Sequence, residues 1–397
     1  MKIVHISIYP PRGEKHAKEG GVASYTKNLI NSTPYAKGDE IYVLCNKLGK
    51  ERTHYKEDNI SVIRCFDRNI KFIFQLLQEL WVLNPDVIHF QQELGLYGGV
   101  ITAYMLQWLL FFLRGKKIYI TIHGVVSLKR VNREFVTRHR SSMPVWLVRL
   151  AFFVIYKPLC VWSSYVIVHE EYFRNVLVDE YGAKEDKIQV IHHGVEEMKT
   201  EQKEKACVSL RIDVKRDIVL FMGYLTGYKD IDLLIEGFSR YNVKNKNAYL
   251  IIGAGKHPRH LHDESYLSEY RRLKEKAKKT LDSSSYRWVG FIPEESITKY
   301  YCASDVSVYP YTVCMSSSGP MAIAMGCNKP FLASHYFEDL LPERKILFDN
   351  TIESFAAKLN DFFANKKEYQ AKCTKMRAER VWNKIGARTY EAYQLKL

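Results

Sequence analysis

The sequence predicts an α/β protein built from two doubly wound, Rossmann-like domains that face each other across a cleft. Strand-like apolar runs alternate with helix-like runs along the chain, which is typical of parallel sheets covered by helices. The alternation stops at a charged stretch near residue 200 and then begins again. With 397 residues, of which 47% are hydrophobic, the chain is long enough to bury two separate cores.

The first domain is expected over residues 1–195. Its predicted strands are short apolar runs, and most of them are separated by segments with helical periodicity. The strands are predicted at 2–8, 40–45, 61–66, 86–90, 117–123, 165–169 and 187–192, and helices at 22–30, 70–83 and 172–181. Parallel strands joined in this way end at one edge of the sheet, where α/β proteins bind their ligands.

A linker is expected over residues 196–215, because its first half is charged and lacks apolar periodicity. A second domain is expected over residues 216–375. Its strands are predicted at 217–223, 248–253, 286–292, 305–309, 330–333 and 345–348. Residues 376–397 have the pattern of one or two amphipathic helices that close the chain.

The formal net charge of +15 indicates an acidic partner: a nucleotide diphosphate, an anionic lipid or a nucleic acid. Nucleic acid is disfavoured, because the sequence contains no recognised nucleic-acid-binding module. The eight cysteines form neither a CxxC pair nor a zinc-like cluster. We therefore expect a reduced, cytoplasmic chain without a metal or other cofactor. Residues 1–10 are expected to be a buried strand, not a signal peptide.

Two apolar segments, 101–113 and 143–162, fall short of an uninterrupted membrane span. Several basic residues lie close in sequence to the second segment and to its aromatic side chains. Basic and aromatic residues together are typical of an interfacial membrane contact, but basic stretches are also common on solvated surfaces. Both interpretations are open. The residues that would make the membrane or acceptor contact are Arg130, Arg133, Arg138, Arg140 and Trp146.

A serine-rich turn after the strand predicted at 305–309 is the strongest ligand-binding signal. Serines and a glycine precede Pro320, which is expected at the first position of a helix. Free backbone N–H groups and the helix dipole favour an anion there, and phosphate is the usual one. An ordinary helix cap is the alternative interpretation. The residues of the predicted phosphate turn are Ser316, Ser317, Ser318 and Gly319.

Further turns follow other predicted strands in the order expected for a ligand-binding edge. Gly21 follows the first strand, His123 ends the strand at 117–123, and Lys229 stands at the entrance of a helix after Gly223. A lysine at that place can neutralise a phosphate, although the spacing of a Walker A motif is not met. Additional donor-binding candidates at this edge are Tyr224, Gly253, Gly255 and Phe291.

In these motifs the chain resembles the glycosyltransferases of family 4, which have the two-domain GT-B fold. The resemblance extends over nearly the whole length. It is carried by the loop ending in Gly20-Gly21 and by residues 86–89, 122–124, 191–195, 223–238, 288–293 and 303–310.

The resemblance implies retaining, metal-independent transfer of a sugar from a nucleotide-diphosphate donor. It implies that the first domain binds the acceptor and the second the donor. It also implies catalytic roles for His123, which lines the reaction centre, and for Lys229, which neutralises the leaving diphosphate.

The sequence departs from the family pattern at three places. Tyr224 stands where the family usually has an arginine, and Met315 and Ile323 stand where it has two glutamates. Neither Met nor Ile can accept a hydrogen bond from a sugar hydroxyl, so the donor cannot be inferred from ordinary members.

Two functions follow. The first is a glycosyltransferase that acts in polysaccharide or glycoconjugate synthesis, with a nucleotide-sugar donor and a glycan or lipid-linked acceptor. Such an enzyme would be cytoplasmic or peripheral on the inner face of the membrane. The second is a catalytically silent GT-B scaffold that stabilises a partner enzyme, which the missing arginine and glutamates favour.

Overall fold

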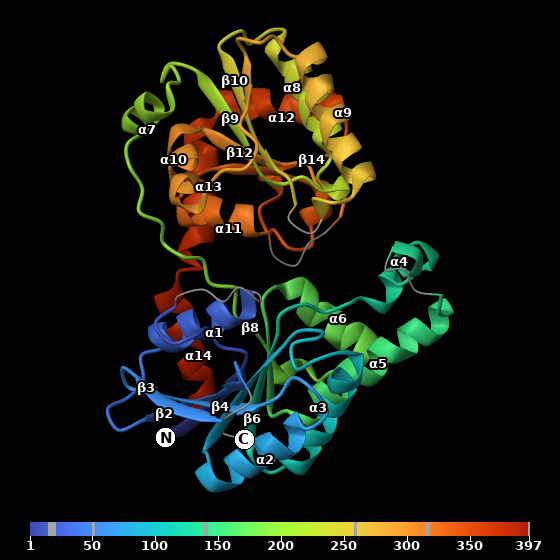
Figure 1. Ribbon diagram of the computed structural model, residues 1–397, viewed down its shortest axis with the longest axis vertical. Coiled ribbons are helices and arrows are strands. Elements are labelled where there is room, and N and C mark those ends of the chain that lie inside the picture. The colour runs from blue at the N-terminus through green and yellow to red at the C-terminus, as the bar shows by residue number, and fades with distance from the viewer. Residues whose placement is uncertain (15–20, 50–51, 139–141, 258–259, 314–317, 396–397) are drawn as a thin grey trace. The chain divides into compact units, whose positions relative to one another are not determined.

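The computed structural model describes residues 1–14, 21–49, 52–138, 142–257, 260–313 and 318–395 (Figure 1). The chain forms two compact units. The first unit contains Met1–Gly194 together with Trp382–Leu397, and the second contains Val195–Val381. Each unit has one sheet covered by helices, so the α/β fold class predicted from the sequence is confirmed.

The first unit contains an eight-stranded sheet with the order β3-β4-β2-β1-β5-β6-β7-β8. All neighbouring strands are parallel except β3 and β4. The strands are β1 (Lys2–Ser7), β2 (Glu40–Asn46), β3 (Thr53–Glu57), β4 (Ile60–Phe66), β5 (Val87–Gln92), β6 (Lys117–Ile122), β7 (Tyr165–Val168) and β8 (Ile188–Val190). The edge strand β3 was not predicted, because its sequence THYKE is polar and mostly exposed.

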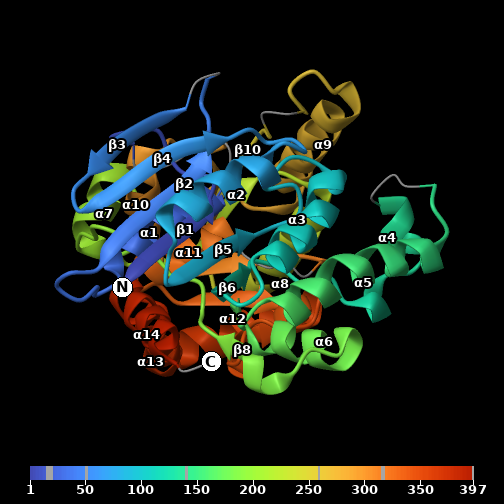
Figure 2. The same cartoon turned by 90° about the horizontal axis from the view of Figure 1, so that it is seen from below.

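Four helices of the first unit form one layer on the sheet, because right-handed crossovers from β4 through β8 all place their helices on the same face. They are α2 (Phe72–Leu83), α3 (Val100–Phe112), α5 (Val145–Trp162) and α6 (Glu171–Tyr181). Neighbours in this series are in contact, and Figure 2 shows the layer from below. The short helix α4 (Arg133–Arg138) and the start of α5 project from the rest of the first unit (Figures 1 and 2).

The opposite face of this sheet carries α1 (Gly21–Ser32) and the last helix, α14 (Trp382–Gln394), which contact each other. The C-terminal segment thus belongs to the first unit. Contact is close at Gly386, since a Cβ atom there would overlap the backbone of Ser32. Tyr393 and Ile385 from α14 are fully buried in the same core cluster as Ile3 and Leu29.

The second unit contains a six-stranded parallel sheet with the order β11-β10-β9-β12-β13-β14. Its strands are β9 (Asp217–Tyr224), β10 (Ala248–Gly255), β11 (Tyr286–Trp288), β12 (Val306–Tyr309), β13 (Phe331–Ser334) and β14 (Leu347–Phe348). Its helices are α7 (Lys203–Leu210), α8 (Ile231–Asn242), α9 (Glu264–Thr280), α10 (Glu294–Ala303), α11 (Gly319–Gly326), α12 (Ile352–Ala364) and α13 (Lys366–Ala378). Every strand of this series was predicted from the sequence, with different ends.

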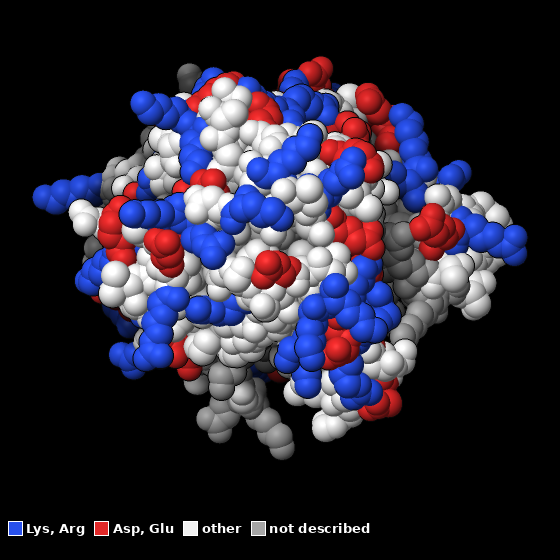
Figure 3. All heavy atoms as spheres, turned by 90° about the horizontal axis from the view of Figure 1, so that it is seen from above, with Lys and Arg blue, Asp and Glu red and all other residues white. Residues whose placement is uncertain are grey.

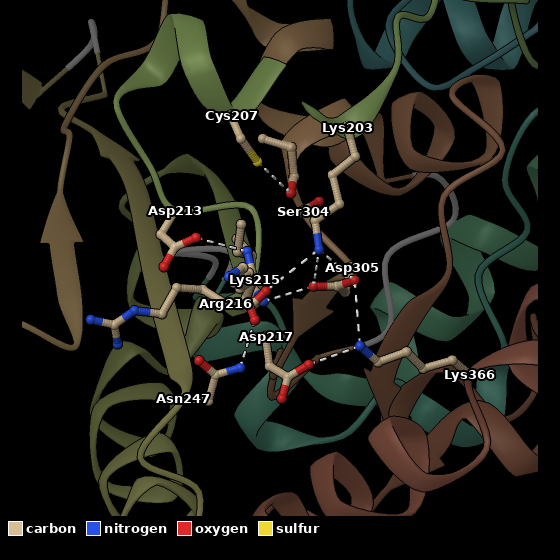
Figure 4. A network of polar contacts seen from close by, with 12 residues as sticks. Lys203, Cys207, Asp213, Lys215, Arg216, Asp217, Asn247, Ser304, Asp305 and Lys366 are labelled. Carbon is tan, nitrogen blue, oxygen red and sulfur yellow. Dashed lines mark hydrogen bonds and ion pairs between the residues drawn. The ribbon is translucent and has the colours of Figure 1, made fainter. Parts of the chain in front are cut away.

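The expected linker, residues 196–215, belongs instead to the second unit and contains α7. It is held by polar contacts that its sequence pattern does not reveal. The Lys203 ammonium binds both carboxylate oxygens of Asp305 at 2.8 Å, and Asp305 also accepts from the backbone N–H of Ile218 (Figure 4). Lys366 joins this network through Asp217. The charged stretch is therefore fixed to the start of β9 and β12.

Candidate functional site

In the second unit, a buried ammonium lies beyond the end of β9. Lys229 ends the short 3-10 helix η3 (Gly227–Lys229) and is only 6% exposed. Burial lowers the pKa of Lys229 to about 8. No carboxylate among the described residues pairs with it. Its Nζ atom lies 5.5 Å from the centre of the Tyr311 ring and 5.9 Å from that of Tyr228, so aromatic faces stabilise the charge in part.

Gly223 makes the room that this ammonium occupies. Its φ is +144°, and a Cβ atom there would lie 2.5 Å from Lys229 Nζ. The same position would lie 3.5 Å from Pro320 Cγ, so the ammonium and the first turn of α11 are neighbours. Two turns predicted separately from the sequence thus meet at one place. A side chain at position 223 would displace the ammonium or strain the backbone.

Hydrogen bonds from α10 and β12 hold the N-terminus of α11 in place. Ser318 is its N-cap residue, Gly319 is its first residue and Pro320 its second, one position later than predicted. The buried hydroxyls of Tyr301 and Tyr309 donate to the Pro320 carbonyl at 2.7 and 2.9 Å. The first turn is therefore fixed before any ligand binds.

The side-chain hydroxyl of Ser318 lies at the N-terminus of α11. Its buried Oγ atom faces the Tyr311 hydroxyl but has no hydrogen bond of normal geometry to any described residue. Of the predicted phosphate turn, Ser318 and Gly319 are described, and Ser316 and Ser317 lie outside the described residues. A Cβ atom at Gly319 would meet nothing within 4 Å.

Two exposed aromatic rings lie at the ends of the neighbouring strands. Tyr224, the last residue of β9, lies nearly parallel to Phe291, with ring centres 6.2 Å apart and 16° between the planes. Phe291 is 60% exposed. Gly253 and Gly255 of β10 lie beneath this loop, because Cβ atoms there would touch Ile292 and Phe291. Packing alone therefore accounts for both glycines, which the sequence singled out as donor-binding candidates.

In the first unit, His123 follows β6 and belongs to a chain of hydrogen-bonded side chains. Its Nε2 atom lies 2.9 Å from the Gln91 side-chain oxygen, and its Nδ1 atom lies 3.2 Å from His169 Nε2. His169 Nδ1 lies 3.0 Å from the Ile191 carbonyl. Burial, followed by His169 and His193, lowers the pKa of His123 well below its usual value, so the ring is neutral.

This series of hydrogen bonds determines which ring nitrogens of His123 and His169 carry a proton. A carbonyl only accepts, so His169 carries its proton on Nδ1 and accepts on Nε2. His123 must then donate from Nδ1, which leaves Nε2 as an acceptor facing Gln91. The Gln91 amide satisfies it by turning its nitrogen toward His123, since both orientations of an amide group have the same shape. Both ring nitrogens of His123 are therefore already used by the protein.

Among the remaining described candidates of the first unit, Arg130, Arg133 and Trp146 lie on elements in contact, since α5 contacts both α4 and the 3-10 helix η1 (Leu128–Arg130). Gly21 is the exposed first residue of α1. Arg130 lies over the ring of Tyr172 at 4.9 Å, and Arg133 is exposed at the start of α4. Trp146 is 65% exposed on α5. Arg138 ends α4, but its side chain, like the whole of Arg140, lies outside the described residues.

Sequence reasoning missed the partners of the site residues. These partners stand at or just after strand ends, as His123 does: Gln91 near the end of β5, His169 after β7 and Tyr311 after β12. The same rule would have found them. Within the described part of the chain, no group of three or more His, Cys, Asp or Glu side chains is arranged to hold a metal ion.

Two family models match the chain. The model of Glycosyltransferase Family 4 matches residues 19–198, and the model of Glycosyl transferases group 1 matches residues 202–380. Together they extend over nearly all of both units. No curated protein matches the chain significantly.

Solved structures with the same fold cover the chain almost completely. Sucrose-phosphate synthase from Thermosynechococcus elongatus has a TM-score of 0.65 and 16% identity, over 99% of this chain and 98% of that one. An E. coli trehalose-6-phosphate structure with bound UDP-2-fluoro glucose has a TM-score of 0.67 and 10% identity, over 100% of both chains. Anabaena HepE with UDP and glucose has a TM-score of 0.61 and 12% identity, over 99% of both chains.

At these identities the structures establish the fold, and the family models establish the family. The two models follow the two units, with their boundary close to the division at Gly194 and Val195. The motifs that suggested a family resemblance lie at the strand ends where these units carry their candidate sites. The chain therefore belongs to the family 4-like glycosyltransferases of the GT-B fold.

Proposed function

We propose that this glycosyltransferase is a retaining, metal-independent enzyme that takes its sugar from a nucleotide-diphosphate donor. The donor binds to the second unit, which includes the expected donor domain 216–375, and the first unit, which includes residues 1–194, binds the acceptor. The acceptor is a glycan, a glycolipid or another lipid-linked molecule in polysaccharide or glycoconjugate synthesis. The enzyme works in the cytoplasm, on the inner face of the membrane when its acceptor is lipid-linked.

The observation that carries the proposal is the buried ammonium of Lys229, which pairs with no carboxylate in the described part of the chain. Burying a charge without a partner costs free energy, and the lowered pKa of Lys229 reflects this cost. An incoming diphosphate supplies the missing negative charge. The N-terminus of α11 adds its backbone N–H groups and its dipole on the same side, with Ser318 as a further donor.

These groups also suit the chemical step. As the donor's glycosidic bond breaks, negative charge develops on the leaving diphosphate. Lys229 and the fixed first turn of α11 stabilise this charge without rearranging, which is the largest contribution in many enzymes. The fold neighbours support the donor class, because two of them were solved with UDP-2-fluoro glucose and with UDP and glucose.

His123 contributes from the first unit as a neutral ring of fixed tautomer. Its Nδ1 atom is committed to His169, which is itself anchored on the Ile191 carbonyl. The contact between Nε2 and Gln91 is the one that a ligand hydroxyl can replace, because Nε2 accepts and a hydroxyl donates. We assign this replacement to a hydroxyl of the sugar or of the acceptor.

The second candidate is a catalytically silent scaffold. It is favoured by Tyr224, which stands in the place of the family's arginine, and by Ile323, a partly buried apolar residue of α11 in the place of a glutamate. A scaffold would retain the fold but would not need a nucleotide.

Thermal unfolding of the full chain with UDP, GDP, ADP and the corresponding nucleotide sugars distinguishes the two candidates. A ligand that binds only the native state at 100 times its dissociation constant stabilises it by about 2.7 kcal/mol. An enzyme therefore gains a clear increase in melting temperature with one nucleotide, and Lys229→Ala loses it. No shift with any nucleotide at millimolar concentration would favour the scaffold.

A further inference from the structure

Three helices of the first unit present large apolar side chains to the outside. The apolar face, as we name it, consists of Phe74 and Trp81 on α2, Ile101 and Trp108 on α3, and Trp146 and Leu150 on α5. Trp81 is 91% exposed, and the other five are between 46% and 73% exposed. Single exposed apolar residues are ordinary, but gathered ones mark an interaction surface.

Helical spacing places these residues on one side of each helix. The α2 and α3 pairs are seven residues apart, and the α5 pair is four apart, which corresponds to one face of an α-helix. The opposite sides carry buried residues, such as Leu76 on α2 and Leu110 on α3. Since α2 contacts α3 and α3 contacts α5, the three helices lie side by side in one layer (Figure 2), and each turns an apolar stripe away from its buried side.

The three helices themselves carry almost no negative charge. The three helices contain a single carboxylate, Glu79, and Arg52 neutralises it at 2.6 Å. Exposed basic residues stand at the edges and within the surface: Lys71 before α2, Arg114 and Lys116 after α3, and Arg149 on α5. On the face drawn in Figure 3, basic side chains lie among acidic ones.

A membrane span is a different arrangement, and the topology excludes it here. Among the described residues α5 is the one helix long and apolar enough to cross a membrane by length and composition. However, α5 connects β6 to β7, which are adjacent parallel strands of one sheet. Both ends of α5 therefore return to that sheet, and its buried side, with Ile155 and Leu159, packs within the unit.

We propose that the apolar face docks in the plane of an anionic lipid bilayer, with its apolar side chains in the interface and the surrounding lysines and arginines on the headgroups. This deepens the peripheral location suggested under the proposed function by naming the surface that makes the contact. The surface extends over three helices, and its α5 part adjoins α4.

The chemistry of the face favours a bilayer over a second copy of the chain. Trp is the residue most suited to the boundary between headgroups and acyl chains, and half of the six Trp residues lie on this face. Anionic headgroups also neutralise Lys71, Arg114, Lys116 and Arg149, whereas a second identical face would bring like charges together.

Flotation of the full-length chain with vesicles tests the proposal without donor, acceptor or activity. We expect it to float with vesicles of phosphatidylcholine containing one-third phosphatidylglycerol, and much less with phosphatidylcholine alone. The triple variant Trp81→Ser, Trp108→Ser and Trp146→Ser should bind more than about tenfold more weakly, because partitioning follows the apolar area buried. Val208→Ser, which alters a 78% exposed apolar residue of the second unit, should float like the wild type.

A charge-reversal pair tests the electrostatic part. The double variant Arg114→Glu and Lys116→Glu should weaken binding about fivefold or more for each residue changed, since a basic residue near an anionic surface contributes about 1 kcal/mol. Lys278→Glu with Lys279→Glu changes the net charge equally on α9 of the second unit and should have little effect.

Two outcomes would overturn the proposal. One is flotation of the triple Trp variant equal to that of the wild type. The other is a wild type that is dimeric by sedimentation without lipid and becomes monomeric in the triple variant, which would make the face a protein interface. A loss of nucleotide binding in Lys229→Ala leaves flotation unchanged, so failure of the proposed enzymatic function is recognised separately.

Discussion

Replacing Lys229 by methionine separates the cost of burying its charge from the use of that charge by a ligand. Methionine has a similar length and no charge, so it fills the space beside Gly223 and Tyr311 without the ammonium. We expect the variant to fold more stably than the wild type at pH 7 and to lose nucleotide-diphosphate binding.

The magnitude follows from the pKa of Lys229, which burial lowers from 10.5 to about 8. That change corresponds to about 3 kcal/mol by which the charged form destabilises the folded chain. The penalty is complete below pH 8, where the lysine is charged in both states. It decreases as the pH rises from about 8 to 10.5 and is absent above that range, because the unfolded chain then also loses the proton.

Urea denaturation at pH 7 and at pH 9.5, with and without UDP, measures both effects. The transition that UDP shifts in the wild type identifies the unit that contains the site. Lys229→Met should raise the midpoint of that transition at pH 7, by less at pH 9.5, and abolish the response to UDP. A variant that is less stable at pH 7, or that still responds to UDP, would refute the reasoning.

Lys329→Met is the matched control, because Lys329 is a second, partly buried lysine whose pKa burial lowers. Its ammonium donates to the backbone carbonyls of Ser304 and Cys302, at 2.5 and 3.5 Å. These carbonyls lie at the other end of the sheet from Lys229. Its replacement should destabilise the chain by leaving them unpaired and should leave the response to UDP intact.

Three further results are expected. Gly223→Ala should weaken UDP binding at least about tenfold in calorimetry, since its Cβ atom would lie 2.5 Å from Lys229 Nζ, whereas Gly227→Ala meets nothing within 4 Å and should bind normally. Asp305→Ala should destabilise the second unit by about 2–4 kcal/mol in urea, because Lys203 and the Ile218 N–H lose their acceptor; a change below the experimental error would contradict the role of this network. His169→Leu should lower kcat/KM about 10- to 100-fold by releasing the tautomer of His123. Because His169 lowers the pKa of His123, the acid limb of the pH profile should also move to higher pH, and an unchanged profile would exclude this positioning role.

Most of the fold could be predicted from local sequence pattern, because buried parallel strands are nearly continuous apolar runs. Strand β3 could not, since its polar sequence is paired at an edge and buries little. Residues 196–215 were predicted to be a linker for a related reason, since charge and missing periodicity are typical of linkers. In the structure Lys203 pairs with Asp305, which lies about a hundred residues away in the sequence. A prediction that considers only neighbouring residues in the sequence cannot detect such an ion pair.

The sequence by itself determined the order of strands and helices, the glycine- and serine-bearing turns at the strand ends, and the family resemblance. Those features are local, since they depend on residues close together in the chain. Only the tertiary structure decided that Gly223 makes room for Lys229 beside α11, that His169 and Gln91 occupy both nitrogens of His123, and that α2, α3 and α5 lie side by side in one layer. Each of these depends on atoms brought together by packing, and neither periodicity nor motif spacing contains that information.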